Sequence, residues 1–489
     1  MFLKGFRRCS DLNGGEDLDE VMADRSTSDC LVQYYRCPRR DLRFAHKGPL
    51  SAARGYFQFG SDATCYGGYC GLDPSPVPAG MLREALRDTV VEDGTVYLPC
   101  DPGQIVESLR RELYVGDWRG RKSMSALARL YYLIRPILPV GLRRHLQRLH
   151  FKGWDKLPFP RWPVDCSVDN LLQELLLLSI RSRGGERIPF IWFWPEGASS
   201  CAIMTHDVET KLGRDFCGTL MDIDDSFGMK ASFQVIPEER YGVSTEFLTS
   251  IRERGFEIVV HDLNHDGHLY RDRKQFLERA AKINAYGRKY GAEGFRAGVL
   301  YRKQLWYDAL EFAYDMSVPN VAHLDPQRGG CCTVMPYFLG NILELPVTTT
   351  QDYTLFLILN DYSIALRKQQ IEVIMQKHGL ISFIAHPDYI AAPRERNVYE
   401  ALLRHLVDLR EKKGVWLTTP GEVNRWWRQR AEMSLVETGK GWRIEGEGKE
   451  RARIAYASEQ DGHCVLALQA ERGQEVDSVS RFFDRAVIS

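Results

Sequence analysis

The sequence predicts an α/β fold in which about seven parallel strands form a barrel. From residue 200 onward, short apolar runs alternate with helical stretches, a rhythm typical of strands joined by crossover helices. The expected strands cover residues 201–205, 231–235, 257–260, 294–296, 342–345, 380–385 and 415–418. Helices are expected between several of them, at 245–254, 273–290 and 397–413. In such a barrel the chemistry belongs where the strands end and the loops begin.

The length of the chain indicates more than one folded unit, because 489 residues exceed what one hydrophobic core usually organises. Hydrophobic residues at 44% and charged residues at 27% are typical of a folded globular protein. We expect a loop-rich N-terminal region over 1–120 and a helical and extended lead-in over 121–200. The barrel should cover 201–430, and a small β-rich appendage with a tail should follow over 431–489.

Charge and cysteine usage limit the partners and the compartment. Lys plus Arg equals Asp plus Glu at 65 each, so no net field attracts nucleic acid, and we expect no nucleic-acid partner. The N-terminus lacks the apolar run of a signal peptide, and no stretch approaches the roughly 20 apolar residues that span a bilayer. The 12 cysteines are scattered rather than regularly spaced, a pattern that is typical of reduced thiols. Together these features predict a cytoplasmic protein.

Two segments leave alternatives open. Residues 125–150 carry apolar residues at helical spacing, which indicates a docking helix or, alternatively, a contact with a membrane surface. The basic end of this segment consists of Arg143, Arg144, Arg148 and His150. Four cysteines could form a structural zinc site, although their spacing is not the usual Cys-x2-Cys. They are Cys30, Cys37, Cys65 and Cys70.

The first barrel strand ends in Thr-His-Asp-Val-Glu at 205–209. Because strand side chains alternate between faces, Asp207 and Glu209 point the same way and Val208 points the opposite way. Two close carboxylates repel each other unless a cation or a shared proton holds them. A metal ion is the simplest remedy.

Two histidines follow the third strand. His261 and His265 are four residues apart, so on a helical turn they would share one face and could bind a single ion. Two histidines and one carboxylate leave coordination positions open for water and substrate, as in a catalytic metal site. The alternative is a pair of capping or surface histidines, and in an irregular turn His268 could replace His265 as a ligand.

Later strand ends add a cation and a proton donor. Arg296 ends the fourth strand, where it could pair with a carboxylate, and His386 follows the strand at 380–385. Each alone would more often be structural. Together the four strand ends provide a base, a metal site, an orienting cation and an acid in one cavity.

In their order along the chain these segments resemble the motifs of the polysaccharide deacetylases, the family-four carbohydrate esterases related to chitooligosaccharide deacetylases. The resemblance covers roughly 230 residues. It implies a distorted (β/α)7 barrel, here with an N-terminal extension and a small C-terminal β unit, and a divalent metal that is usually zinc. The matching segments are Thr-His-Asp-Val-Glu, His-Asp-x-x-His, Phe-Arg-x-Gly and Ile-x-His.

The resemblance also implies a role for each site residue. Asp207 is the expected general base, Arg296 holds that base, and His386 is the acid. The expected metal ligands are His261, His265 and Glu209. Asp352, in Gln-Asp-Tyr at 351–353, resembles the residue that supports the acid, and a backbone amide near Tyr301 is expected to bind the oxyanion.

Three positions depart from the family pattern. Val208 stands where the family usually has a second aspartate, which is why the ligand role passes to Glu209. Asp262 replaces a Ser or Thr between the histidines, and the proline expected after the arginine motif is missing. These changes bear on the substrate class more than on the reaction.

The predicted function is a metal-dependent amidohydrolase that acts on a linear amide, the N-acetyl group of an amino sugar or a glycan precursor. One alternative is hydrolysis of another C–N bond, in a cyclic imide or ureide, on the same barrel. The other alternative is a catalytically silent barrel that binds glycan or a protein partner, with Val208 as a sign of decay.

Overall fold

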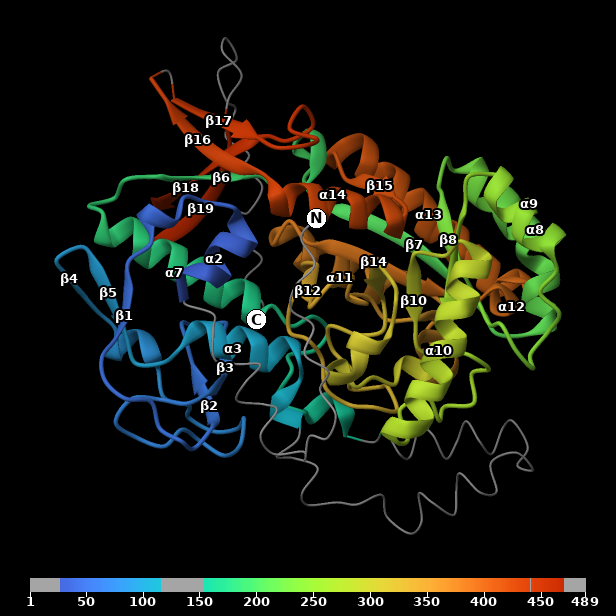
Figure 1. The fold of residues 1–489 in the computed structure, drawn as a ribbon, viewed down its shortest axis with the longest axis horizontal. Coiled ribbons are helices and arrows are strands. Elements are labelled where there is room, and N and C mark those ends of the chain that lie inside the picture. Colours follow the sequence, from blue (N-terminus) through green and yellow to red (C-terminus); the bar gives the residue numbers. More distant parts are fainter. Residues whose placement is uncertain (1–26, 116–150, 152, 440, 470–489) are drawn as a thin grey trace, which may run out of the picture.

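The computed structural model describes residues 27–115, 151, 153–439 and 441–469. A curled sheet with its covering helices fills one side of the molecule, and the first and last described segments, coloured blue and red, both lie on the other side (Figure 1). The predicted basic segment at 125–150 and its Arg143 and Arg144 lie outside the described residues. Among the described residues, no helix is both long enough and apolar enough to cross a bilayer.

One large sheet organises the barrel region. From one edge its strands run in the order β12, β13, β11, β10, β9, β8, β7, β14, and β15 pairs with the start of β7. All neighbours are parallel except β12 and β13. The bounds are β7 Cys201–Val208, β8 Ala231–Val235, β9 Glu257–His261, β10 Gly294–Arg296, β11 Tyr314–Asp315, β12 Tyr337–Leu339, β13 Ile342–Glu344, β14 Leu380–Ala385 and β15 Trp416–Thr418.

All the strands that the sequence predicted are present, and the mixed α/β class with a curled sheet agrees with the prediction. The strand count differs, because the structure adds β11 and β12, which have only two and three residues and no apolar run of their own. The α-helices that follow β7 are α8 Lys211–Ser226, α9 Thr245–Glu253, α10 Arg273–Tyr290, α11 Ala365–Gln376, α12 Pro387–Ile390, α13 Pro393–Lys413 and α14 Pro420–Glu432. The structure describes every residue between β10 and β13. In this stretch, short 3-10 turns stand where crossover helices would be expected.

Threonine side chains connect the two ends of the curled sheet. The segment after β13 runs beside β14, where Thr348 Oγ1 donates to Leu380 O at 2.7 Å and accepts from Ser382 N at 2.9 Å. Thr349 Oγ1 donates to Ser382 O at 2.8 Å. These hydroxyls satisfy backbone groups at an edge that would otherwise be open. The curvature brings the carboxyl ends of distant strands to one rim.

The N-terminal and C-terminal parts share one hydrophobic core around α7 (Figure 1). β6 pairs with β18, and β18 with β19, so the last strands complete a sheet that begins before the barrel. Arg430 ties the parts together through its guanidinium, which donates to the carbonyls of Tyr34 at 3.0 Å and Ile191 at 2.7 Å. The remaining elements are α2 Thr27–Tyr35, β1 Phe44–His46, β2 Gly55–Gln58, β3 Thr64–Gly67, β4 Val90–Glu92, β5 Thr95–Leu98, α3 Pro102–Arg110, α7 Ser167–Ser182, β6 Ile188–Ile191, β16 Ser434–Thr438, β17 Gly441–Glu445, β18 Ile454–Gln460 and β19 His463–Leu468.

Candidate metal centre

Asp207 is held at the rim by an arginine on another strand. Arg296 Nη1 donates to Asp207 Oδ1 at 2.6 Å and to Thr205 Oγ1 at 2.8 Å, and its Nε donates to Met316 O at 3.0 Å. The guanidinium is fully buried, and Asp207 is 4% exposed. Burial raises the pKa of Asp207, but the nearby charges of Arg296, His261 and His386 outweigh it and lower the pKa below its usual value. The carboxyl is therefore ionised and fixed.

Val208 points away from this rim. It is fully buried in the apolar cluster that β7 and β8 form with their covering helices. Alternation along β7 thus sends Asp207 to the rim and Val208 into the core. Val208 is part of the packing and does not occupy a ligand position.

His261 and His265 converge, but not on a helical turn, and the sequence prediction was wrong on this point. β9 ends at His261, and the chain then enters a loop in which Asp262 and His265 both have φ of +56°. The two rings lie 4.9 Å apart, centroid to centroid. His261 Nδ1 lies 3.1 Å from Arg296 O, and because a carbonyl only accepts, Nδ1 carries the proton and Nε2 presents its lone pair.

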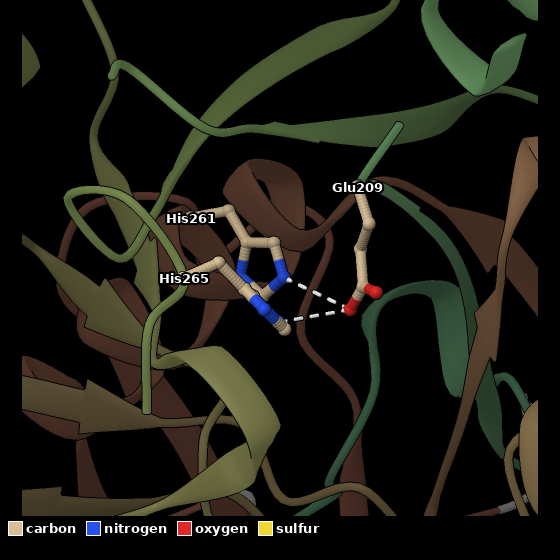
Figure 2. Close-up of side chains that lie close together, drawn as sticks. All are labelled: Glu209, His261 and His265. Carbon is tan, nitrogen blue, oxygen red and sulfur yellow. Dashed lines mark ion pairs between the residues drawn. The ribbon is translucent and has the colours of Figure 1, made fainter. Parts of the chain in front are cut away.

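Glu209 faces both histidines from the end of β7 (Figure 2). Its Oε1 lies 2.9 Å from His265 Nε2 and 3.8 Å from His261 Nε2. The three donor atoms lie within 4.8 Å of one another. Zinc binds such atoms at about 2.0–2.1 Å, so the ligands of one tetrahedral ion are roughly 3.3 Å apart. The spacing here fits that value after small movements.

Two further features of these residues fit a cation. His261 Nε2 is buried and has no hydrogen-bond partner among the described residues, and the buried His265 Nε2 lies against the Glu209 carboxylate at 2.9 Å. Buried polar atoms rarely stay unpaired without a ligand or water. Burial raises the pKa of Glu209, but His265 and the neighbouring imidazoles outweigh it and hold the pKa well below the usual value. Glu209 is thus a carboxylate ready to bind a cation.

His386 follows β14 and is held by Asp352. Asp352 Oδ1 lies 2.6 Å from His386 Nδ1, and its Oδ2 accepts from His386 N at 2.6 Å. His386 Nε2 points to Glu209 Oε1 at 3.5 Å. Burial lowers the pKa of His386, but the Asp352 carboxylate, with help from Glu209, raises it well above the usual value. His386 therefore carries a proton that it could donate.

The Tyr301 amide itself donates to Gly298 O at 3.2 Å. The expected role of a backbone amide near Tyr301 in binding an oxyanion stays a prediction. His268 is 57% exposed and pairs with Asp266 at 3.6 Å, so it does not replace His265.

The four-thiolate zinc site is also absent. Among the described residues, Glu209, His261 and His265 form the one group of side chains that could hold a metal ion. The four candidate cysteines are free thiols.

A hollow beside the His386–Asp352 pair was not predicted. Its Leu300 and Val347 share a small apolar cluster with Ile384, two residues before His386, and Gln351 lies directly before Asp352. The other lining groups include the Trp162 ring, the Thr349 hydroxyl and the Asp325 carboxyl. Gln351 Nε2 donates to Asp325 Oδ1 at 3.1 Å. Burial raises the pKa of Asp325 to about 6, although the charge of Arg302 opposes this rise. The lining residues come from five segments, at 162–163, 300, 319–325, 347–354 and 370, so no local pattern could have revealed the hollow.

No family model matches the chain, and no curated protein matches it. Among the solved structures that are similar to about half of it are the following three. A protein of Mycobacterium smegmatis assigned as a polysaccharide deacetylase has 17% identity and a TM-score of 0.40, over 49% of this chain and 93% of its own. Puue allantoinase has 13% identity and a TM-score of 0.37, over 48% and 92%. The Bacillus subtilis peptidoglycan deacetylase PdaC has 13% identity and a TM-score of 0.32, over 48% and 94%. Similarities this distant assign no activity to this chain.

Proposed function

We propose that the protein is a metal-dependent deacetylase that hydrolyses the N-acetyl group of an amino sugar or glycan precursor. The observation that carries the proposal is the convergence of His261, His265 and Glu209 beside Asp207. We further propose zinc as the metal, because two histidines and one carboxylate with open positions are typical of catalytic zinc. The catalytic unit would be the barrel region over 201–430.

The protein groups divide the proton transfers between them. Asp207, ionised and fixed by Arg296, accepts a proton from the water that attacks the acetyl carbon. His386, protonated and fixed by Asp352, donates a proton to the sugar nitrogen as the C–N bond breaks. Acetate and a free amine result. The chemistry that a divalent cation supplies in such a site is to acidify water and to polarise a carbonyl oxygen.

Metal content and acetate release test the function. The full chain should bind one equivalent of zinc and release acetate from N-acetylated sugars. Asp207→Asn should keep the metal and lose turnover by about 100-fold or more, whereas His261→Ala should lose both. The exposed His268→Ala is the matched control and should keep both. Full zinc loading of His261→Ala would refute the ligand assignment.

The same assay separates the alternatives. Turnover of cyclic imides or ureides, but not of acetylated sugars, would replace deacetylation with hydrolysis of another C–N bond. Glycan binding without metal and without turnover would identify a silent barrel.

A further inference from the structure

The loop behind His265 has an unfavourable backbone. Val299 and Leu300 have φ of +61° and +52°, a region that residues other than glycine seldom adopt and that Val299, which is branched at Cβ, strongly avoids. Consecutive residues of this kind persist only where surrounding contacts hold them in place. The loop follows Arg296 directly, so its position bears on the metal centre.

Arg302 holds this loop from its C-terminal side. Its guanidinium is fully buried, and Nη1 donates to Leu300 O at 2.9 Å. The Arg302 backbone is fixed as well, because its N–H donates to Gln327 Oε1 at 3.1 Å and its carbonyl accepts from Gln327 Nε2 at 3.0 Å. The strained residues are thus held by Arg302, and Arg302 itself needs a partner for its charge.

That partner is Glu112, 190 residues away in the N-terminal region. Arg302 Nε donates to Glu112 Oε2 at 2.7 Å, and Nη2 pairs with Oε1, so the contact is bidentate. The two side chains are 0% and 7% exposed. Glu112 Oε1 also accepts from Gly330 N at 2.6 Å. A planar, buried, two-point contact of this kind fixes direction as well as distance.

The surrounding chain holds Glu112 rigidly. Just before it, Arg110 O accepts from Gln304 Nε2 at 3.0 Å, and just after it, Tyr114 Oη donates to Gly330 O at 2.7 Å. The short segment after α3 therefore lies against two barrel loops, at 298–304 and at 327–332. Glu112 alone reaches Arg302 from this segment through a salt bridge.

The held loop supports His265 directly. A methyl group added at Gly298 would lie 2.9 Å from His265 Cδ2 and 2.5 Å from Asp262 Oδ2, so the Gly298 backbone packs tightly against the ring. His261 has a hydrogen bond to Arg296 O that fixes its ring. For His265, the packing of Gly298 fixes the ring, while Arg240 Nη2 holds the backbone by donating to His265 O at 2.6 Å. A displacement of the loop at 298–302 would therefore act on the imidazole through Gly298.

We infer that Glu112 and Arg302 form a positioning pair that sets the location of His265, so that the N-terminal region is a part of the metal centre. The inference rests on the proposed metal site. Groups that orient metal ligands from outside the coordination sphere typically change metal affinity by 10–100-fold when they are removed. Neither residue touches the ion or the substrate, and both act through the loop and His265.

The test measures zinc affinity of the full chain by competition with a chromophoric chelator, together with thermal unfolding. Glu112→Gln keeps the shape of the side chain and removes its charge, and it is expected to weaken zinc binding about tenfold or more. Glu107→Gln is the matched control, because it makes the same chemical change at the partly buried salt bridge between Glu107 and Arg111, which does not include Arg302. It should lower thermal stability but leave zinc affinity within about twofold of the natural chain.

Two further variants keep the inference falsifiable. Gly298→Ala should weaken zinc binding by direct displacement of His265. Arg302→Lys keeps the charge but cannot make the bidentate contact, so it should also weaken zinc binding, and it replaces Glu112→Gln if that variant does not fold.

The outcomes separate this inference from the proposed function. Unchanged zinc affinity in Glu112→Gln and Arg302→Lys, with normal binding in the natural chain, would overturn the positioning role alone. Equal weakening in Glu107→Gln would show that the loss of zinc affinity comes from general destabilisation of the N-terminal region, and it would also overturn the positioning role. A natural chain that binds no zinc would overturn the metal site and this inference together.

Discussion

Asp352 contacts His386 twice, at the ring and at the backbone of the same residue. The Nδ1 contact and the N–H contact are both 2.6 Å long, and each uses a different carboxylate oxygen. One carboxylate thereby fixes both where the His386 main chain lies and how its ring is turned. Nε2, the remaining ring nitrogen, faces Glu209 and the open side of the site.

Asp352→Asn should shift the pH dependence of turnover. Asp352 is the main group that raises the pKa of His386 against the effect of burial, so its neutralisation lowers that pKa. The acid then loses its proton at a lower pH, and the basic limb of the rate profile moves to lower pH, with a fall in kcat of about 100-fold at neutral pH. Rates measured from pH 5 to 10 check this, with the exposed variant Asp308→Asn as control. An unmoved basic limb would remove His386 from the acid role.

Arg296→Lys should act on the other limb of the profile. Lysine cannot donate at once to Asp207, Thr205 and Met316 as the guanidinium does. The charge that opposes burial is then displaced, and the pKa of Asp207 rises. Since a base must be ionised to act, the acidic limb should move up by roughly one unit. The surface variant Arg404→Lys serves as control, and a profile that changes only in height would contradict the assigned role.

Val208→Asp should not restore a metal ligand. Val208 lies in the apolar cluster behind β7, so the new carboxylate would be buried without a partner. The expected cost is about 3 kcal/mol or more in the free energy of unfolding, against about 1–2 kcal/mol for Val208→Ala. Chemical denaturation measures both values. Tighter zinc binding by Val208→Asp at unchanged stability would show that this position does face the site.

The sequence could predict the parts of the site that depend on local pattern. The alternation at 205–209 determined that Asp207 and Glu209 share a face, and the apolar strands before His261 and His386 located both histidines at one rim. Such inferences need only the period of a strand and the rule that parallel strands end together. The seven strands were found for the same reason.

The sequence could not predict what depends on backbone irregularity or distance. Asp262 and His265 adopt a positive φ, so a loop stands where a helical turn was expected. Neither residue is a glycine, the residue type that would have indicated a positive φ in the sequence. β11 has two residues, one of them the buried Asp315, and so carries no apolar run. The contact between Glu112 and Arg302 joins two charged residues that look like ordinary surface positions until the fold buries them.

Asp315 and Glu344 make stability fall as the pH rises. They are fully buried at opposed positions on β11 and β13. Burial raises the pKa of Glu344 well above its usual value, and the Asp315 charge beside it raises it further, so the pair keeps a shared proton in the folded state. The unfolded chain releases that proton above about pH 4.3. Between that value and the raised folded pKa, the native state binds more protons, and the free energy of unfolding declines by up to about 1.4 kcal/mol per pH unit.

Glu344→Gln removes this titration and keeps a group that can donate to Asp315. The variant should be about as stable as the natural chain near pH 5 and more stable at pH 8, because the decline with pH is gone. Denaturation at pH 5, 6, 7 and 8 measures the slope, and the exposed Glu253→Gln should keep the natural one. Parallel slopes for Glu344→Gln and the natural chain would show that the pair holds no proton, and that its two charges must be stabilised by another group inside the barrel.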